Sequence, residues 1–290
     1  MNLHAIVTTF NPVPSLLERA VVSALRTPGV ERLTIVDDGS LAPVADPTGD
    51  SRVEVVRQAN AGPSAARNAG LDRSRGDFAV LLDDDDEFIA EGVTRAVELA
   101  RSMDAAGALV GRIEARADGT ERRREAPPEW AGRAMPRPGD AFRPIQLFNA
   151  SGTIVARRAI ERGLRYDTSL WVVEDREFIR RLADVGPIAV APGFAVRAGV
   201  RPGGERLTSA ANLVRRARGH EAMMAKWLDT ESEAHFRELT LWLLNAMSKA
   251  GLAREEIYRS LYARAAGLRW IGPLRAIKLS ARAALGRAPA

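Results

Sequence analysis

The chain has 290 residues, of which 46% are hydrophobic and 27% charged, and it contains no cysteine. This composition is sufficient for a globular core, and it excludes a disordered chain, a disulfide framework, a zinc–thiolate site and a thiol nucleophile. No apolar run approaches the about 18 residues that span a bilayer, and the start, MNLHAIVTTF, resembles a strand rather than a secretory signal. We therefore expect a cytoplasmic protein.

Short β-rich runs alternate with helical stretches in the first hundred residues, which is typical of a parallel sheet with crossover helices. The expected strands are Ala5–Thr9, Leu33–Val36, Val53–Val56 and Phe78–Leu82. The expected helices are Leu16–Leu25, Ser64–Arg73 and Ala90–Met103. The pattern predicts an α/β domain.

The character of the chain changes after residue 108. A strand from Leu109 and a turn at Asp118-Gly119 predict a hairpin, and we expect the Arg- and Pro-rich segment from Arg116 to Pro144 to be a flexible loop. Short strands and helices return between Ile154 and Val196, and the chain beyond residue 210 is expected to be helical.

The net charge of +5 is concentrated in the last part of the chain. Residues 251–290 contain eight Lys or Arg and two Asp or Glu, which is +6 and leaves about −1 for the rest. Two apolar stripes at helical spacing lie in the C-terminal part: Phe236, Leu239, Leu243, Ala246 and Ala250, and then Leu274, Ile277, Ala281 and Leu285. The second stripe is flanked by Arg275, Lys278 and Arg282, which suits an anionic membrane surface, although packing on the domain explains it equally well.

Polar clusters follow the carboxyl ends of the expected strands, which is where ligands bind in an open parallel sheet. After the first strand, Thr8, Phe10 and Asn11 place hydroxyl and amide groups beside an aromatic ring that can stack on a base. An ordinary turn with Asn11 or Ser15 as the helix cap is the alternative. After the second strand, VDDGS places Asp38 where a carboxylate can accept hydrogen bonds from a ribose or base, and an Asx-turn explains the same residues equally well.

The segment NAGPSAARNAGL, residues 60–71, places Arg67 in the first turns of an expected helix. A helix amino end together with an arginine suits a phosphate group. Local physics equally allows Ser64 to be a simple N-cap and Arg67 a surface side chain.

Five adjacent acids, Asp83 to Glu87, follow the strand Phe78–Leu82. They repel one another, so this run is costly unless a cation or a helix amino end offsets the charge. Oxygen ligands favour magnesium or manganese, and magnesium completes its shell with diphosphate oxygens. A calcium loop is a weaker explanation because the EF-hand pattern is absent, and a solvated acidic surface is the remaining alternative. Farther along, Glu174 and Asp175 stand at the start of an expected helix. Acidic residues there stabilise the helix through its dipole, which explains the pair without a functional role.

Together, VTTFN, VDDGS, NAGPSAARNAGL, GDFAVLLDDDDEF and VVEDREFIRRL stand in the order and approximate spacing of the family 2 glycosyltransferases, which the chain resembles from about Ala5 to Leu182. The resemblance implies the GT-A fold, an α/β fold with a Rossmann-like, mixed but mostly parallel sheet flanked by helices. It implies a catalytic domain over residues 1–205, with a nucleotide-sugar half (1–108) and an acceptor half (109–205). A helical C-terminal extension with the basic tail would follow over residues 206–290.

The resemblance also implies an inverting, Mn²⁺- or Mg²⁺-dependent transfer of a sugar from a nucleotide diphosphate sugar, with a UDP-sugar favoured. The acceptor would be a hydroxyl of a saccharide or glycolipid in bacterial surface polysaccharide or glycolipid synthesis. The implied nucleotide contacts are Thr8, Phe10, Asn11, Asp38, Arg67, Asp83 and Asp84. The implied metal ligand is Asp85, with the register within Asp83 to Asp86 open by one position, and the implied catalytic pair is Asp175, the general base, with Glu174.

Two other functions are alternatives to the one that the resemblance implies. A nucleotidyltransferase would need a phosphate loop rich in Gly, Arg and Lys near the first strand, and VTTFNPVP contains none. A non-catalytic module that holds nucleotide sugars or anionic lipid is the third possibility. We expect no nucleic-acid partner, and at most peripheral contact of the 251–290 tail with an anionic membrane at its inner face. His4, His220 and His235 are expected to be structural or surface residues, with His220 the one candidate metal ligand, and Ser151-Gly152-Thr153 is expected near the acceptor.

Overall fold

The computed structural model describes residues 2–115, 119–135, 149–170, 172–199 and, farther along, residues 219, 222, 223 and 226. The chain divides into two compact units, Met1–Gly203 and Gly204–Ala290. The predicted boundary after residue 205 lies close to this division, and the assignment of a catalytic domain with two halves and an extension stays a prediction. The apolar stripes, the basic tail, His220 and His235 lie outside the described residues.

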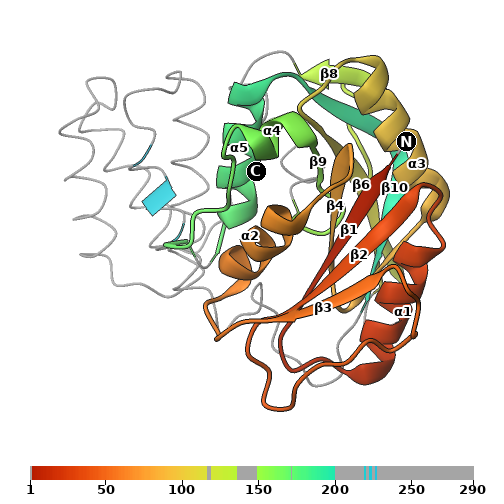
Figure 1. Ribbon diagram of the computed structural model, residues 1–290. Coiled ribbons are helices and arrows are strands. Elements are labelled where there is room, and N and C mark those ends of the chain that lie inside the picture. Colours follow the sequence, from red (N-terminus) through yellow and green to blue (C-terminus); the bar gives the residue numbers. More distant parts are fainter. Residues whose placement is uncertain are drawn as a thin grey trace, which may run out of the picture. The chain divides into compact units, whose positions relative to one another are not determined.

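A mixed sheet of ten described strands forms the centre of the first unit (Figure 1). The strands are β1 Leu3–Thr9, β2 Val30–Asp37, β3 Val53–Arg57, β4 Phe78–Asp83, β5 Asp86–Phe88, β6 Gly107–Ala115, β7 Glu121–Arg124, β8 Arg133–Met135, β9 Ile154–Ala156 and β10 Ile188–Ala198. Their order is β3-β2-β1-β4-β9-β6-β10-β5, with β7 on β6 and β8 on β10. The pairs β3–β2, β2–β1, β1–β4 and β6–β10 are parallel, and β9 runs antiparallel between β4 and β6.

Helices cover both faces of the sheet. They are α1 Pro14–Leu25, α2 Pro63–Arg73, α3 Ala90–Ser102, α4 Arg157–Glu161 and α5 Glu174–Val185. Figure 1 shows α1 and α3 on one face and α2, α4 and α5 on the other. Among the described residues, no helix has the length and apolar character needed to cross a membrane.

The expected elements of the first half are all present, with ends that differ by a few residues. The hairpin predicted after Leu109 is confirmed, because β6 pairs antiparallel with β7 from Arg112 to Ala115. Over the described part of the segment from Arg116 to Pro144, the expectation of a loop is wrong at β8, which pairs with β10, whereas β7 is the second strand of the predicted hairpin. The flexibility expected of this segment stays a prediction. The rest of that segment lies outside the described residues.

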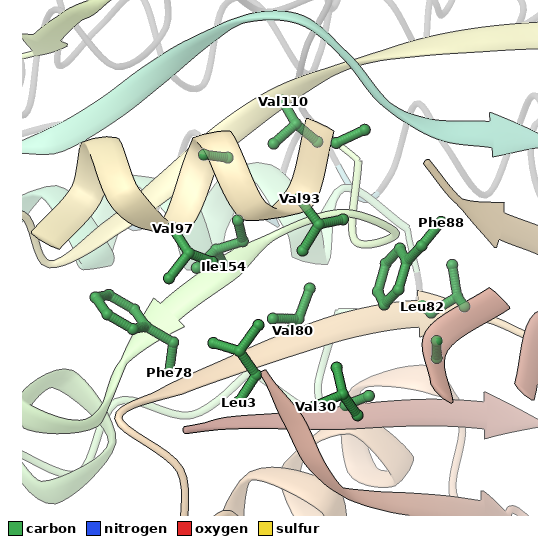
Figure 2. Close-up of a cluster of buried hydrophobic side chains, with 14 of the residues drawn as sticks. Leu3, Val30, Phe78, Val80, Leu82, Phe88, Val93, Val97, Val110 and Ile154 are labelled. Atoms are coloured by element: carbon green, nitrogen blue, oxygen red, sulfur yellow. The ribbon is translucent and has the colours of Figure 1, made fainter. Parts of the chain in front are cut away.

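One layer of the hydrophobic core lies between the sheet and helices α1 and α3. Figure 2 shows Leu3, Val80 and Leu82 of the strands packed against Val93 and Val97 of α3. Every second residue of a strand points to the same face, so the alternating apolar residues of β1 and β4 build this layer. The burial fixes the strands in register and thereby positions the residues at their ends.

The register brings several chain segments to the carboxyl edge of the sheet. Thr9 at the end of β1 stands opposite Asp37, and Thr8 stands opposite Asp83. At the other end of the strand order, Ala198 of β10 pairs with Asp86 of β5 and with Glu114 of β6. The predicted convergence of the polar clusters is therefore present in the first unit.

Candidate active site

Four aspartates form a tight turn between β4 and β5. Asp84 is buried and accepts a hydrogen bond from Thr9 Oγ1 at 2.5 Å. Asp86 is buried as well, and its Oδ1 accepts the backbone N–H of Gly199 at 3.0 Å. The side chain of Asp83 is 31% exposed. Two of the four carboxylates thus hold the turn in place, and Asp83 and Asp85 are the more accessible ones.

The cost of crowding acids at the end of an apolar strand is visible at Asp86. Burial, together with the charges of Asp83 and Asp85, raises the pKa of this carboxyl to about 7, against the opposing effect of hydrogen bonds from Ser151 and Gly199. Ser151 also accepts the backbone N–H of Asp83 at 3.3 Å. Ser151, which we expected near the acceptor, therefore supports the acidic turn.

The donor set of this turn fits a hard divalent cation that is shared with a ligand. Among the described residues, no group of three or more His, Cys, Asp or Glu side chains is arranged to hold a metal by itself. Magnesium in nucleotide sites does not need such a group, since it binds through one or two carboxylates and takes its other ligands from phosphate and water. Asp85, half-buried in the turn at the carboxyl edge, meets that requirement.

Arg67 of α2 connects the acidic turn to the start of α5. Its Nη2 donates to Asp83 Oδ1 at 3.1 Å, and its Nη1 donates to Glu174 Oε1 at 2.8 Å. The guanidinium carbon also lies 5.4 Å from the centre of the Tyr166 ring, a cation–π distance. Burial would lower the pKa of Arg67, but the charges of Asp83 and Glu174 outweigh that effect and raise it. A permanent buried cation therefore holds two carboxylates from distant parts of the sequence.

The adjacent acids at the start of α5 have different environments. Glu174 is buried against Arg67. Burial and the charge of Asp175 together raise its pKa to about 7, although Arg67 opposes the shift. Asp175 is half-buried, and its Oδ1 accepts the backbone N–H of Arg176 at 2.7 Å. The preceding residue, Val173, has a φ of 67°, in the left-handed region that β-branched residues rarely adopt. Val173 is the N-cap of α5, so its backbone conformation sets the direction in which the helix starts and thereby the orientation of Glu174 and Asp175.

Two further side chains of α2 hold the segment that precedes α5. Asn68 donates from Nδ2 to the Tyr166 carbonyl at 2.9 Å and accepts the Tyr166 N–H at 2.7 Å. Ser64 Oγ donates to the Leu170 carbonyl at 3.2 Å. The Tyr166 ring stacks on Phe178 of α5 with centroids 3.9 Å apart. The sequence has no signal for the hydrogen bonds of Asn68 and Ser64, because each partner lies about a hundred residues away.

Two of the simpler explanations for α2 are wrong. The N-cap of the helix is Gly62, with a φ of 88°, and no side chain caps it, so Ser64 is not a simple N-cap. Arg67 is 5% exposed, so it is not a surface side chain. Its predicted contact with a nucleotide stays a prediction.

Asp38 shapes the loop that leads into α2. The buried carboxylate accepts hydrogen bonds from Gln58 Nε2 at 2.7 Å and from the backbone N–H groups of Ala61 and Gly62 at 3.0 and 2.8 Å. Its neighbour Asp37 accepts the backbone N–H of Ser40 at 2.8 Å, a local bond that holds the turn but reaches one residue farther than an Asx-turn. Asp38 thus lies at the carboxyl edge, and its contact with a base or ribose stays a prediction.

The loop after β1 is fastened to the loop after β2. The Asn11 N–H donates to Ser40 Oγ, and Asn11 Oδ1 accepts the Leu41 N–H, each at 2.8 Å. Helix α1 has Val13 as its N-cap and no side-chain cap, so the alternative in which Asn11 or Ser15 caps it is wrong. Phe10 is 44% exposed beside this junction, as a ring that stacks on a base would be.

The profile of glycosyl transferase family 2 matches residues 4–164. The chain belongs to glycosyl transferase family 2. This match confirms the family expected from the five motifs, and its range contains the acidic turn and α2. The start of α5, with Glu174 and Asp175, follows the matched range.

Two relatives from Rhizobium meliloti are both named as succinoglycan biosynthesis proteins. The succinoglycan biosynthesis protein ExoO is 31% identical over 215 residues, which is 68% of this chain and 60% of ExoO. The succinoglycan biosynthesis protein ExoW is 31% identical over 112 residues, 36% of this chain and 35% of ExoW. The chain therefore spans less than two thirds of the length of these relatives.

Solved structures share the fold at low sequence identity. TarS of S. aureus in complex with UDP-GlcNAc aligns with a TM-score of 0.69 and 16% identity, over 98% of this chain and 88% of TarS. The mannosyltransferase PcManGT of Pyrobaculum calidifontis, in complex with GDP-Man and Mn²⁺, aligns with a TM-score of 0.60 and 18% identity, over 98% of this chain and 79% of the other. The expected GT-A fold of this family 2 member is confirmed.

Proposed function

We propose that this family 2 chain is an inverting glycosyltransferase that moves a sugar from a nucleotide diphosphate sugar, with a UDP-sugar favoured, to a hydroxyl of a saccharide or glycolipid. The observation that carries the proposal is the double contact of Arg67 with Asp83 and Glu174, because it puts the acidic turn and the Glu174–Asp175 pair in one site. The relatives named for succinoglycan biosynthesis favour a surface-saccharide acceptor, and the complex of TarS with UDP-GlcNAc favours a UDP-linked donor.

The donor would lie on the carboxyl edge of β1, β2 and β4. The proposed donor contacts are Thr8, Phe10, Asn11, Asp38, Arg67, Asp83 and Asp84. Phe10 is suited to stacking on the base because its ring is exposed, whereas Asp38 and Asp84 hold the surrounding loop and turn. Asp85 would hold Mn²⁺ or Mg²⁺, which when bound with the diphosphate offsets the charge of the leaving group.

The chemical step would depend on Asp175. Its carboxylate is the more accessible acid of the pair, and it would take the proton of the acceptor hydroxyl while that oxygen attacks the anomeric carbon. The bond from that carbon to the diphosphate oxygen breaks on the opposite face, so the configuration inverts. Glu174 would act through Arg67, whose buried positive charge keeps the start of α5 next to the donor side.

The basic tail gives the proposed setting. Residues 251–290 carry a charge of +6, and the pattern of Arg275, Lys278 and Arg282 beside an apolar stripe suits the surface of an anionic membrane. We propose a peripheral contact at the cytoplasmic face, where a lipid-linked acceptor would be accessible.

Release of the nucleotide in the absence of acceptor tests the proposal without knowledge of the acceptor. The protein is incubated separately with a UDP-, a GDP- and a dTDP-sugar in the presence of Mn²⁺. Only the UDP-sugar should be hydrolysed slowly to release UDP, and no UDP should be released when Mn²⁺ is left out. Asp85→Asn should abolish this release, and Glu87→Gln, a change in the same acidic run at a residue that pairs with Arg19, should retain it. Equal release by Asp85→Asn and the parent would remove Asp85 from the metal site. Release of a sugar 1-phosphate in place of UDP would favour a nucleotidyltransferase, because transfer of the nucleotidyl group leaves one phosphate on the sugar.

A further inference from the structure

Three arginines surround one carboxylate where β6 pairs with β7. Arg112 Nε donates to Glu114 Oε1 at 2.7 Å. Arg124 Nε lies 3.5 Å from the same oxygen, which is an ion-pair distance but too long for a strong hydrogen bond. Arg122 stands directly opposite Glu114 in the ladder and, within the part of the chain that the structure describes, makes no ion pair. Three positive charges therefore share a single negative one.

The cluster also contains donors without acceptors. Arg112 Nη1 and Arg124 Nε are buried atoms, and neither has a hydrogen-bond partner among the residues that the structure describes. Buried N–H groups of charged side chains are almost always satisfied, because leaving them unpaired costs free energy. The side chains of Arg112 and Arg124 are nevertheless 19% and 25% exposed and Arg122 is exposed, so the cluster extends to the surface next to the two buried donor atoms.

The electrostatics agree with an excess of positive charge. Burial lowers the pKa of Arg124, and the neighbouring charges of Arg122 and Arg112 lower it further, although Glu114 opposes this. Burial alone would raise the pKa of Glu114, but the hydrogen bond from Arg112 and the charges of the three arginines hold it below its ordinary value. The single negative charge of Glu114 therefore does not balance the positive charges of the three arginines.

The pairing register gives the position of the cluster relative to the acidic turn. Asp86 pairs with Ala198, Ala198 with Glu114, and Glu114 with Arg122, so these four residues form one line across β5, β10, β6 and β7. With strands about 4.8 Å apart, Arg122 lies roughly 14 Å from Asp86 along the carboxyl edge. The cluster therefore lies on the same edge of the sheet as the acidic turn, in the half of the unit predicted to bind the acceptor.

We propose that Arg112, Arg122 and Arg124 bind an oxyanion, a phosphate or a carboxylate, that the acceptor carries. The planar guanidinium group pairs with both kinds of anion through two parallel N–H···O bonds, and the unpaired Nη1 and Nε donors are of the kind that such bonds use. Glu114 holds Arg112 and Arg124 in place without the ligand and competes with it. Only the assignment of the anion to the acceptor rests on the proposed function; the anion site itself does not.

Calorimetric titration of the full chain with inorganic phosphate, and separately with glucuronate, at constant ionic strength tests the site. Arg122→Gln should weaken binding of the preferred anion about tenfold through loss of one charged donor pair. Because Arg122 is exposed, this variant should fold normally. Glu114→Gln should strengthen binding severalfold, because the competing carboxylate is gone. The matched control Arg123→Gln changes the same charge on the same strand, at a residue that faces Phe194, and should bind like the parent.

The outcomes separate this site from the donor site. Binding of phosphate points to a phosphorylated acceptor and binding of glucuronate to an acidic sugar, and either one with this pattern of variants supports the site. No binding of either anion, or equal binding by the parent, Arg122→Gln and Glu114→Gln, would overturn it. Titration of the same proteins with UDP and Mn²⁺ tests the proposed function independently. UDP binding without anion binding would refute only the arginine site, and the reverse result would refute only the donor site.

Discussion

At the scale of single residues, Arg67 is the side chain that contacts both acidic segments of the proposed site. It is 5% exposed and touches Asp83, Glu174 and the ring of Tyr166. A buried ion pair of this kind adds little net stability compared with apolar packing, but removal of one partner leaves an uncompensated charge. Arg67 is therefore better understood as the residue that sets the geometry of the two carboxylates.

Arg67→Met should lower the free energy of unfolding by about 3–5 kcal/mol, because Asp83 and Glu174 lose their counter-charge in a buried site. Urea denaturation at pH 7 measures the change. Arg73→Met, in the last turn of the same helix, should cost far less. The double variant Arg67→Met/Glu174→Gln should regain part of the loss. Equal costs for Arg67→Met and Arg73→Met would show that the Arg67 ion pairs are not important for stability.

His4 gives a prediction for pH. It is buried, as expected of a structural residue; its Nε2 pairs with Thr34 Oγ1 at 2.8 Å, and its Nδ1 accepts the backbone N–H of Arg75 at 3.2 Å. Burial lowers its pKa from 6.5 to about 4, and the charges of Arg32 and Arg75 contribute. Between these values the unfolded state binds the proton more tightly, so stability falls as the pH decreases from 6.5 to 4, by up to about 3 kcal/mol.

His4→Gln should remove this dependence. The difference in unfolding free energy between parent and variant, measured from pH 7 to pH 4, should shift in favour of the variant as the pH falls. The carboxylates titrate in both proteins and cancel in the difference. Parallel curves over this range would contradict the neutral, buried state of His4.

At the scale of elements, α2 holds together parts of the chain that are far apart in sequence. Its amino end is fixed by Asp38, and its side chains Ser64, Arg67 and Asn68 hold the segment from Tyr166 to Glu174. Gly70 allows the helix to approach β1 closely, since a side chain there would collide with Ile6. The motif that suggested a phosphate site thus also positions the proposed base.

A second element, the end of β10, supports the acidic turn. A methyl group on Gly199 would collide with the backbone carbonyl of Asp85. Gly199→Ala should therefore displace the turn and weaken Mn²⁺-dependent binding of UDP by about tenfold or more, as judged by calorimetry. In the control Gly186→Ala the new methyl would meet mainly the end of the Arg158 side chain, at 3.3 Å, and UDP binding should be unchanged. Unchanged binding by Gly199→Ala would mean that the turn is not held by β10.

The sequence predicts those elements whose signal is local. The apolar runs that become β1 and β4, and the Pro and Gly residues that precede α2, are sufficient to place these elements and the polar residues at their ends. The pairing of Ser64 and Asn68 with the segment before α5, and the burial of Arg67, depend on tertiary packing between distant segments, so no local pattern contains them. For the same reason the pairing of the short strand β8 with β10 has no signal in the sequence.

At the scale of the whole molecule, the charge of the chain is divided between an almost neutral main part and a basic end. The tail of residues 251–290 carries +6, against about −1 for everything before it. A short basic segment of this size is attracted to anionic lipid by about 1 kcal/mol per charge near the surface, and the attraction falls with salt. The main part of the chain would contribute little to such binding.

Sedimentation with vesicles tests the tail. The full chain should bind vesicles of phosphatidylcholine with about a third phosphatidylglycerol, and release as the salt approaches about 0.5 M because the charges are then screened. Charge reversal at Arg275, Lys278 and Arg282 should abolish the binding, whereas reversal at Arg26, Arg95 and Arg101 should not. Binding by the first variant that equals the parent would exclude the tail as the membrane contact.

The central claim is that the acidic turn and Asp175 serve one reaction in one site. The most direct measurement compares sugar transfer and UDP affinity for Asp175→Asn, with Asp184→Asn near the end of the same helix as the control. We predict that Asp175→Asn lowers the transfer rate by about 10²–10⁴-fold and leaves Mn²⁺-dependent UDP binding unchanged, while Asp184→Asn alters neither. Near-normal transfer by Asp175→Asn would contradict the claim.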